Sequence, residues 1–173
     1  MLIVISGPIA SGKSTVARAL ARDLGRSGTA VAMIDLDLVY DMLEPDHVRK
    51  DDAAKWLRAR RASAALADAF LLDGVEVVIV EGEFLTPDDR RAFVDALHSG
   101  EKPRFVTLRT SFDVALRRVD ADPTRTFSRD RAFLSRHYRE AERPLLELAS
   151  TDLVLDTTSI DADEAARRIA KSV

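Results

Sequence analysis

The feature that most constrains this chain is a nine-residue segment near its start, with glycine at its first and sixth positions and lysine and serine after the second glycine. The segment follows the apolar residues 2–5 and precedes apolar residues at helical spacing. Glycines so placed let successive backbone N–H groups face inward, beside the positive end of the following helix. A strand, this loop and a helix in that order predict a site for the phosphates of a nucleotide. The segment consists of Gly7, Pro8, Ile9, Ala10, Ser11, Gly12, Lys13, Ser14 and Thr15.

Two side chains of this segment carry chemistry that a nucleotide needs. Lys13 supplies a mobile positive charge for the β- and γ-phosphates, and the Ser14 hydroxyl is the expected ligand of Mg²⁺. We therefore expect ATP and Mg²⁺ as cofactors. The alternative is a glycine-rich turn that binds nothing.

Five short runs rich in valine, isoleucine and leucine predict the strands of a parallel sheet, because they are apolar without alternation, as strands buried on both faces are. They cover residues 2–5, 30–34, 75–80, 105–108 and 153–155. Helical patterns lie between them, at residues 12–24, 51–72, from 86 onward, 111–119, 129–149 and 161–171. This alternation predicts a three-layer α/β fold, and the length of 173 residues predicts one domain.

Two helix ends can be read from single residues. Gly25 is expected to end the first helix, since glycine commonly follows the last helical residue. Thr86 is expected to cap the third helix, with Pro87 at its first position and acidic residues in its first turn.

Composition excludes several classes of function. A net charge of −3 provides no overall field for nucleic acid or an anionic membrane, and the absence of cysteine excludes thiol chemistry and disulfides. The chain has no asparagine or glutamine, which guanine recognition and water activation in GTPase switches use. The class of function that remains is the transfer of phosphate to a bound acceptor. The first apolar run is too short for a signal peptide, so we expect a cytoplasmic protein. We expect this protein to be a monomer or a homodimer.

Two aspartates follow the second predicted strand. Asp35 and Asp37 are two residues apart, which places them on the same side of an extended chain at the carboxyl edge of the sheet. Asp37 is expected to bind the acceptor hydroxyl, and Asp35 to face the metal or act as the base. The alternative is a pair of cap carboxylates that lead into a helix.

The third predicted strand runs into Glu81, Gly82 and Glu83. Glu81 can reach Mg²⁺ through water, Gly82 permits close approach of an acceptor to the backbone, and Glu83 would line the acceptor site. A solvated glutamate at a strand end is the alternative reading of Glu81.

Arginines and histidines give weaker signals. Arg58 and Arg61 share one face of the second predicted helix and could grip an acceptor within a region of about residues 38–72, although a charged solvent face is the alternative. Trp56 is read as a packing residue. The three histidines are read as packing or surface residues because their spacing does not suit a metal; they are His47, His98 and His137.

A polar stretch centred on Pro123, at about residues 120–130, is predicted to act as a lid. Arg117 or Arg118 is expected near the adenine, and Arg125 near the phosphates, where its charge would stabilise phosphoryl transfer. Helix-terminal arginines that complement the helix dipole are the alternative.

With the loop, the paired aspartates and the lid in this order, the chain resembles small-molecule kinases of the nucleoside-monophosphate-kinase fold, such as shikimate kinases, gluconate kinases and chloramphenicol phosphotransferases. The resemblance implies a five-stranded parallel sheet in the order 2-3-1-4-5, helices on both faces, an acceptor-binding helical region and a lid. It assigns the second aspartate, Asp37, to the acceptor hydroxyls, and it implies that Thr157 borders the adenine.

The chain departs from the shikimate kinase pattern at two places. Glu81, Gly82 and Glu83 stand where those enzymes have three glycines, and residues 142–146 lack their Arg-x-Pro-Leu-Tyr sequence. Two glutamates would repel an anion and suit a neutral or cationic acceptor, such as an antibiotic, nucleoside or sugar derivative.

The sequence therefore predicts an ATP-dependent phosphotransferase that acts on a hydroxyl of a small molecule. A nucleoside or nucleotide kinase is the first alternative. A non-catalytic, ATP-binding regulatory module is the second, and a closed acceptor site with an exposed apolar patch would favour it.

Overall fold

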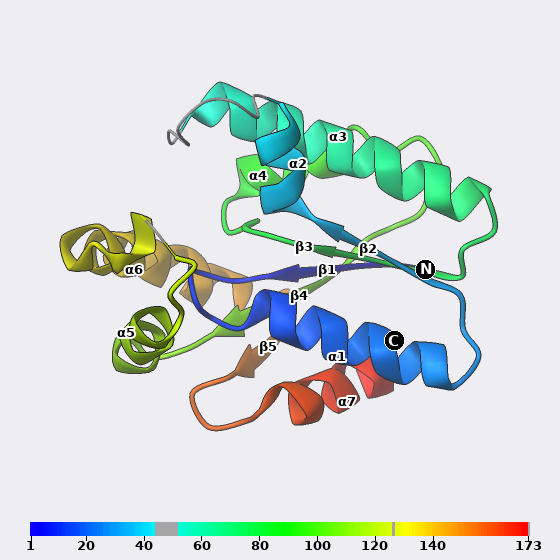
Figure 1. Ribbon diagram of the computed structural model, residues 1–173. Helices are drawn as coiled ribbons and strands as arrows, with labels where there is room; N and C mark the ends of the chain where they lie inside the picture. The colour runs from blue at the N-terminus through cyan, green and yellow to red at the C-terminus, as the bar shows by residue number, and fades with distance from the viewer. Residues whose placement is uncertain (44–51, 126, 173) are drawn as a thin grey trace.

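In the computed structural model, five parallel strands form one sheet in the order β2-β3-β1-β4-β5 (Figure 1). The structure describes residues 1–43, 52–125 and 127–172. The predicted sheet and its strand order are confirmed. The inner strands are buried along their whole length where the sequence is continuously apolar, as in β1 and β3. The strands are β1 (Leu2–Ser6), β2 (Val31–Asp35), β3 (Val77–Glu81), β4 (Arg104–Arg109) and β5 (Leu153–Asp156).

Helices cover both faces of this sheet. In the described ranges they are α1 (Lys13–Arg26), α2 (Leu36–Met42), α3 (Ala53–Leu72), α4 (Pro87–Val94), α5 (Phe112–Ala121), the short 3₁₀ helix η1 (Phe127–Arg129), α6 (Arg131–Leu148) and α7 (Ala162–Ser172). Helices α1 and α7 lie side by side on one face, and α2, α3 and α4 lie on the other. Every helix in the described ranges is too short or too polar to cross a bilayer.

The core consists of two apolar layers, one on each side of the sheet. Alternate residues of β1 enter opposite layers, because side chains of a strand alternate between faces. Ile3 and Ile5 pack with α1 and α7, whereas Leu2 and Val4 pack with the helices of the other face. Helices therefore pack on both faces of the sheet, and this packing fixes the position of its strands.

One predicted helix end is confirmed and another is wrong. Thr86 caps α4 in a reciprocal capping box with Asp89, as its sequence position predicted. Gly25 does not end α1: the helix continues to Arg26, and the glycine in the left-handed region, with φ +87°, is Gly28. Gly25 therefore lies inside the last turn of α1, where glycine costs about 0.5–1 kcal/mol relative to alanine.

The carboxyl ends of the strands gather at one edge of the sheet. The loop that follows β1 lies there, and α5 and α6 lie beyond this edge (Figure 1). In an open parallel sheet this edge is where ligands bind. The residues singled out from the sequence follow β1, β2 and β3, so the fold brings the ends of these neighbouring strands to one place.

Candidate functional site

The loop between β1 and α1 has a backbone shape that requires glycine at two positions. Gly12 has φ +96°, in the left-handed region, and directly precedes α1. A Cβ atom at Gly7 would lie 2.5 Å from the carbonyl oxygen of Leu108, closer than a side chain allows. Ala10 has φ +60°, a conformation that costs a residue with a Cβ about 1–2 kcal/mol. The loop is therefore a tightly wound turn.

Ala10 is held in this conformation by helices that come much later in the chain. Its side chain is 7% exposed and belongs to an apolar cluster with Ala115 and Val119 of α5 and Leu134 of α6. Burial of the methyl group offsets part of the backbone cost. The shape of the loop thus depends on contacts with α5 and α6.

Arg118 and Thr157, both predicted near the adenine, bind the loop itself. The Arg118 guanidinium donates to the carbonyl oxygen of Ala10 at 3.0 Å and to that of Thr157 at 2.7 Å. The Thr157 hydroxyl donates to the carbonyl oxygen of Ser11 at 2.7 Å. Arg117 is exposed on α5. These contacts anchor the loop to the end of β5, and a contact of any of the three residues with adenine stays a prediction.

Positive charge lies at the mouth of the loop. The Lys13 ammonium donates to the carbonyl oxygens of Gly7 at 2.9 Å and Pro8 at 3.1 Å, so it crosses from one side of the loop to the other. No side chain caps the N-terminus of α1, and its first turn has no acidic residue. The backbone N–H groups and the positive end of the helix dipole therefore face the loop without an anionic side chain of their own. This arrangement suits a phosphate group.

Glu81 and Asp35 form a carboxylate pair beside the loop. They are the last residues of β3 and β2 and face each other in register. Burial, together with the negative charge of Asp35, raises the pKa of Glu81 to about 7, although a hydrogen bond with Ser14 and the charge of Lys13 oppose this shift. The alternative of a solvated Glu81 is wrong, because the residue is 3% exposed.

This pair fits a magnesium ion that arrives with a nucleotide. Two carboxylates at adjacent strand ends repel each other, and a divalent cation would neutralise both. The Ser14 hydroxyl is hydrogen-bonded to Glu81. It adds a hydroxyl oxygen beside the two carboxylates, and Mg²⁺ accepts oxygen ligands of both kinds. Among the described residues, no three His, Cys, Asp or Glu side chains form a metal site. Phosphate and water would therefore complete the coordination.

Asp37 does not lie on an extended chain, so the predicted geometry of the aspartates is wrong. Asp35 ends β2 and caps α2: its Oδ1 atom accepts hydrogen bonds from the backbone N–H groups of Asp37 at 2.9 Å and Leu38 at 3.4 Å. This is the cap arrangement that the sequence left as an alternative. Asp37 lies exposed in the first turn of α2, and its charge acts on Glu83.

The Glu83 carboxylate lies where the turn after β3 meets α6. Its Oε2 atom is 3.4 Å from the Nε2 atom of His137. Burial raises the pKa of Glu83 to about 7; the positive charges of Lys13 and Arg60 oppose this shift, and the negative charges of Asp89 and Asp37 add to it. Charges from the loop, α2, α3 and α4 therefore act on one carboxyl group.

The arginine of α3 that reaches this region is Arg60. Its guanidinium donates to the carbonyl oxygen of Glu83 at 3.0 Å and forms an ion pair with Asp89 at 2.9 Å. Arg58 and Arg61 share a face of α3 as predicted, but both are exposed. Their contact with an acceptor stays a prediction, and sequence reasoning missed Arg60 because its ion-pair partner is distant in the sequence.

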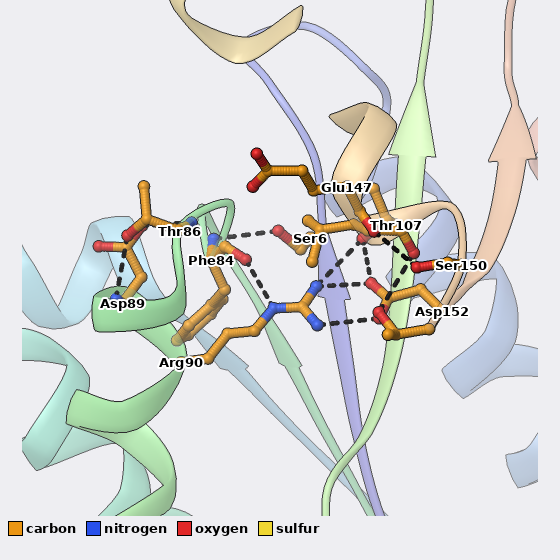
Figure 2. Close-up of polar contacts among 11 residues, drawn as sticks. Ser6, Phe84, Thr86, Asp89, Arg90, Thr107, Glu147, Ser150 and Asp152 are labelled. Carbon is orange, nitrogen blue, oxygen red and sulfur yellow. Dashed lines mark hydrogen bonds and ion pairs between the residues drawn. The ribbon is translucent and has the colours of Figure 1, made fainter. Parts of the chain in front are cut away.

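A network from α4 to Asp152, the residue before β5, fixes the turn that carries Glu83. Figure 2 shows Arg90 reaching across to Asp152. Its guanidinium donates to both carboxylate oxygens of Asp152, at 2.8 and 2.5 Å, and its Nε atom donates to the carbonyl oxygen of Phe84 at 3.1 Å. The Phe84 N–H group donates to the Ser6 hydroxyl at 3.0 Å. Both polar groups of the residue after Glu83 are therefore anchored.

The remaining predicted residues have mixed outcomes. The Trp56 ring packs on Tyr40, with ring centroids 4.0 Å apart, which confirms its packing role. His47 lies outside the described residues. Of the predicted lid, residues 120–121 end α5 and residues 122–125 and 127–130 connect it to α6; Arg125 is paired with Asp122 at 3.1 Å. A lid movement that brings Arg125 to a phosphate stays a prediction.

Gly82 packs against the start of α2, and a Gly82→Ala variant is expected to be destabilised. A Cβ atom there would lie 2.5 Å from the Leu36 Cβ atom, so the junction that carries Asp35 would have to shift. We expect a loss of about 1–3 kcal/mol in the free energy of unfolding, measured with urea. Gly25→Ala is the matched control, because no atom lies within 4 Å of its Cβ position; it should be neutral or slightly stabilising. Equal stability of the two variants would contradict this expectation.

Comparisons with known proteins agree with this architecture. A family model described as an AAA domain matches residues 2–144. The adenylyl-sulfate kinase of Bacillus pumilus is 29% identical over 174 residues, which cover 99% of this chain and 84% of that protein. An APS kinase structure from Mycobacterium tuberculosis, in complex with AMPPNP and APS, has a TM-score of 0.68 at 22% identity and covers 98% of this chain and 95% of that chain. A shikimate kinase from Acinetobacter baumannii, in complex with shikimate, has a TM-score of 0.68 at 20% identity and covers 98% and 90%. The fold implied by the resemblance is confirmed.

Proposed function

Because the chain belongs to the AAA domain family, we propose that it is an ATP-dependent phosphotransferase that moves the γ-phosphate of ATP to a hydroxyl group of a small molecule. The observation that supports this proposal is that the positively charged loop and a pair of carboxylates lie next to each other at the edge of the sheet. The loop with Lys13 provides positive charge and backbone donors, and the carboxylates of Glu81 and Asp35 lie beside it. A nucleotide phosphate and a cation each find their partner there.

Each residue has a role in this proposal. The loop residues 7–15 bind the phosphates, with Lys13 on the β- and γ-phosphates. Ser14, Asp35 and Glu81 would hold Mg²⁺, which when bound neutralises phosphate charge. Arg125 would approach the phosphates from residues 120–130, and Arg117 or Arg118, with Thr157, would border the adenine.

The proposed transfer is a single displacement. The acceptor oxygen forms a bond to the γ-phosphorus atom, and the bond from that atom to the bridging oxygen of ADP breaks, so ADP leaves with the electron pair. The proton of the acceptor hydroxyl goes to a carboxylate. Asp37 is proposed for this task because it is exposed in the first turn of α2, close enough to act on Glu83. Asp35 stays the second candidate for the base.

The charges around Glu83 support a neutral or cationic acceptor. Lys13, Asp89, Arg60 and Asp37 all act on this carboxyl group. The two cations already have partners, since Lys13 bonds to loop carbonyl oxygens and Arg60 is paired with Asp89. An anionic acceptor would therefore meet carboxylates without a cation reserved for it. Residues 38–72 are proposed as the acceptor-binding region, with Gly82 and Glu83 at its inner end and Arg58 and Arg61 on its outer face.

A nucleotide derivative is the second candidate acceptor. The observation that favours it is the identity to a curated adenylyl-sulfate kinase along nearly the whole chain. Adenylyl sulfate is anionic, so this candidate and the charge argument make opposite predictions about the acceptor.

An acceptor screen that reports ADP release tests the proposal. Purified protein with ATP and Mg²⁺ is given adenylyl sulfate, shikimate, gluconate, nucleosides, amino sugars and hydroxyl-bearing antibiotics in turn. Release of ADP that depends on one acceptor, with phosphate recovered on that acceptor, is the expected result. ATP binding without transfer to any acceptor in the panel would favour the regulatory-module alternative.

An Asp37→Asn variant is expected to lose turnover while it still binds nucleotide. The amide cannot accept the hydroxyl proton, so kcat should fall by about 10²–10⁴-fold, and the Kd for AMPPNP should stay within about twofold. Asp95→Asn, at the exposed C-terminus of α4, is the matched control and should keep the wild-type rate. A wild-type rate for Asp37→Asn would remove this residue from the mechanism.

A further inference from the structure

Two neighbouring residues of α6 hold one residue of the phosphate loop. The backbone N–H group of Ile9 donates to the Nε2 atom of His137 at 3.1 Å. The Tyr138 hydroxyl donates to the carbonyl oxygen of Ile9 at 2.8 Å. Both polar backbone groups of Ile9 are thus bound by side chains that follow residues 120–130 in the chain. Ring packing of Tyr138 on Phe112, with centroids 5.7 Å apart, joins this part of α6 to α5.

The chemistry of these bonds defines the state of each side chain. A nitrogen that accepts a hydrogen bond must carry a lone pair, so His137 is neutral and has its proton on Nδ1. Burial raises the pKa of Tyr138, so its hydroxyl keeps its proton and remains a donor. Ile9 is therefore held by one acceptor and one donor.

The same nitrogen of His137 also faces the acceptor side of the site. The Oε2 atom of Glu83 lies 3.4 Å from Nε2, and the His137 side chain is 15% exposed. Glu83 comes from the turn that Arg60 and Arg90 anchor through backbone oxygens. The imidazole thus lies between the phosphate loop and the carboxylate assigned to the acceptor.

We propose that His137 is a positioning residue for the phosphotransfer proposed above, and that its Nε2 atom, as a hydrogen-bond acceptor, fixes the Ile9 peptide of the phosphate loop. The inference rests on that proposed function. Packing alone would need the ring but not its nitrogen, whereas the Ile9 N–H group donates to Nε2. Ile9 uses the one lone pair of this nitrogen, so the Glu83 carboxylate at 3.4 Å is a neighbour of the ring and not a second hydrogen-bond partner. Sequence reasoning read His137 as a packing or surface residue because it considered metal spacing alone, and Ile9 is far away in the sequence.

Four variants test this role. His137→Leu removes the acceptor of the Ile9 N–H group, His137→Gln keeps an oxygen acceptor, Tyr138→Phe removes the other hydrogen bond of Ile9, and His98→Leu is the matched control. His98 lies in the connection before β4, where its backbone N–H group donates to Asp68. The readouts are the Kd for AMPPNP from calorimetry, and kcat and the acceptor KM from ADP release.

The expected pattern distinguishes a positioning role from a structural one. Loss of one hydrogen bond should raise the Kd for AMPPNP by about 3- to 10-fold in His137→Leu and in Tyr138→Phe. The acceptor KM should stay within about twofold of wild type in both variants, because neither removes a hydrogen bond to Glu83. His137→Gln should return the Kd to within about threefold of wild type, and His98→Leu should match wild type.

Three outcomes would overturn the inference. The first is a His137→Leu variant that has a lower melting temperature but a wild-type Kd for AMPPNP. The second is a His137→Gln variant as impaired as His137→Leu, since the ring shape would then matter and not the hydrogen bond. The third is a His137→Leu variant whose acceptor KM rises while its Kd for AMPPNP stays at the wild-type value, because the effect would then lie on the acceptor side and not in the loop.

Failure of the proposed function gives a different result. AMPPNP binding needs no acceptor, so a wild-type protein that binds AMPPNP but phosphorylates no compound overturns phosphotransfer. Under that result the loop contact of His137 is judged by the AMPPNP affinities of the Leu and Gln variants. Equal affinities of these two variants would overturn it as well.

Discussion

Lys13→Ala is expected to lower kcat for acceptor phosphorylation by about 10³-fold, the range in which loss of a single transition-state cation falls. The Lys13 ammonium crosses the mouth of the loop and bonds to two of its carbonyl oxygens, so it is the charge nearest to where phosphate would bind. An alanine leaves the charge that develops on the transferred phosphoryl group without this partner. ADP release measured with saturating acceptor gives the value.

The matched control for this variant is Lys102→Ala, because Lys102 is exposed and lies in the connection before β4. It should keep the wild-type kcat. Lys13→Arg should not restore activity, since a planar guanidinium does not replace a compact ammonium inside a tight loop. A Lys13→Ala variant with the wild-type rate would contradict the assignment of the loop to phosphate.

Asp152→Ala is expected to reduce the free energy of unfolding by about 3–5 kcal/mol, which is a large part of the stability of a domain of this size. The Asp152 side chain is 2% exposed and accepts bonds from Arg90 and from the Thr107 hydroxyl, the latter at 2.5 Å (Figure 2). Without the carboxylate, the Arg90 guanidinium stays mostly buried without its counter-charge. Urea unfolding followed by circular dichroism measures the loss.

Two further variants complete this test. Arg90→Met combined with Asp152→Leu should be clearly more stable than Asp152→Ala, because it removes both charges and fills the space. Arg91→Met is the matched control: its ion pair with Asp88 is exposed, so its loss should change stability by less than about 1 kcal/mol. If Asp152→Ala and Arg91→Met unfold at the same urea concentration, the ion pair of Arg90 does not stabilise the fold.

Local sequence chemistry predicted the sheet and the phosphate loop well. Both depend on patterns that are complete within a few residues: continuous apolar runs for the strands, and two glycines before Lys13 for the loop. The cap of α4 at Thr86 belongs to the same class, because its partner Asp89 is three residues away. In these three cases the interacting groups lie close in sequence, and the structure follows the prediction.

Competition between two local structures explains the error at Asp37. The sequence allowed an extended chain or a helix start after β2, and the helix start won because the Asp35 carboxylate satisfies two backbone N–H groups at once. As a consequence, the two aspartates lie in different places. Asp35 is beside Glu81 at the strand ends, and Asp37 is exposed on the surface of α2.

Arg60 and His137 could not be found from the sequence, because their partners are distant in the chain. Arg60 contacts the turn after β3, and His137 contacts the loop after β1. Side-chain spacing identifies which residues share a helix face but not which face turns inward. For α3, that choice depends on how the helix packs on the sheet, which is a tertiary property.

The left-handed conformation of Ala10 has a consequence for protein engineering. The loop sequence cannot be transplanted as an independent cassette, because Ala10 keeps its φ of +60° through apolar contacts with α5 and α6. Grafted into another strand–turn–helix unit, the same nine residues are expected to relax toward an ordinary turn and lose the backbone arrangement that we propose binds phosphate. A functional graft would have to carry α5 and α6 along with it.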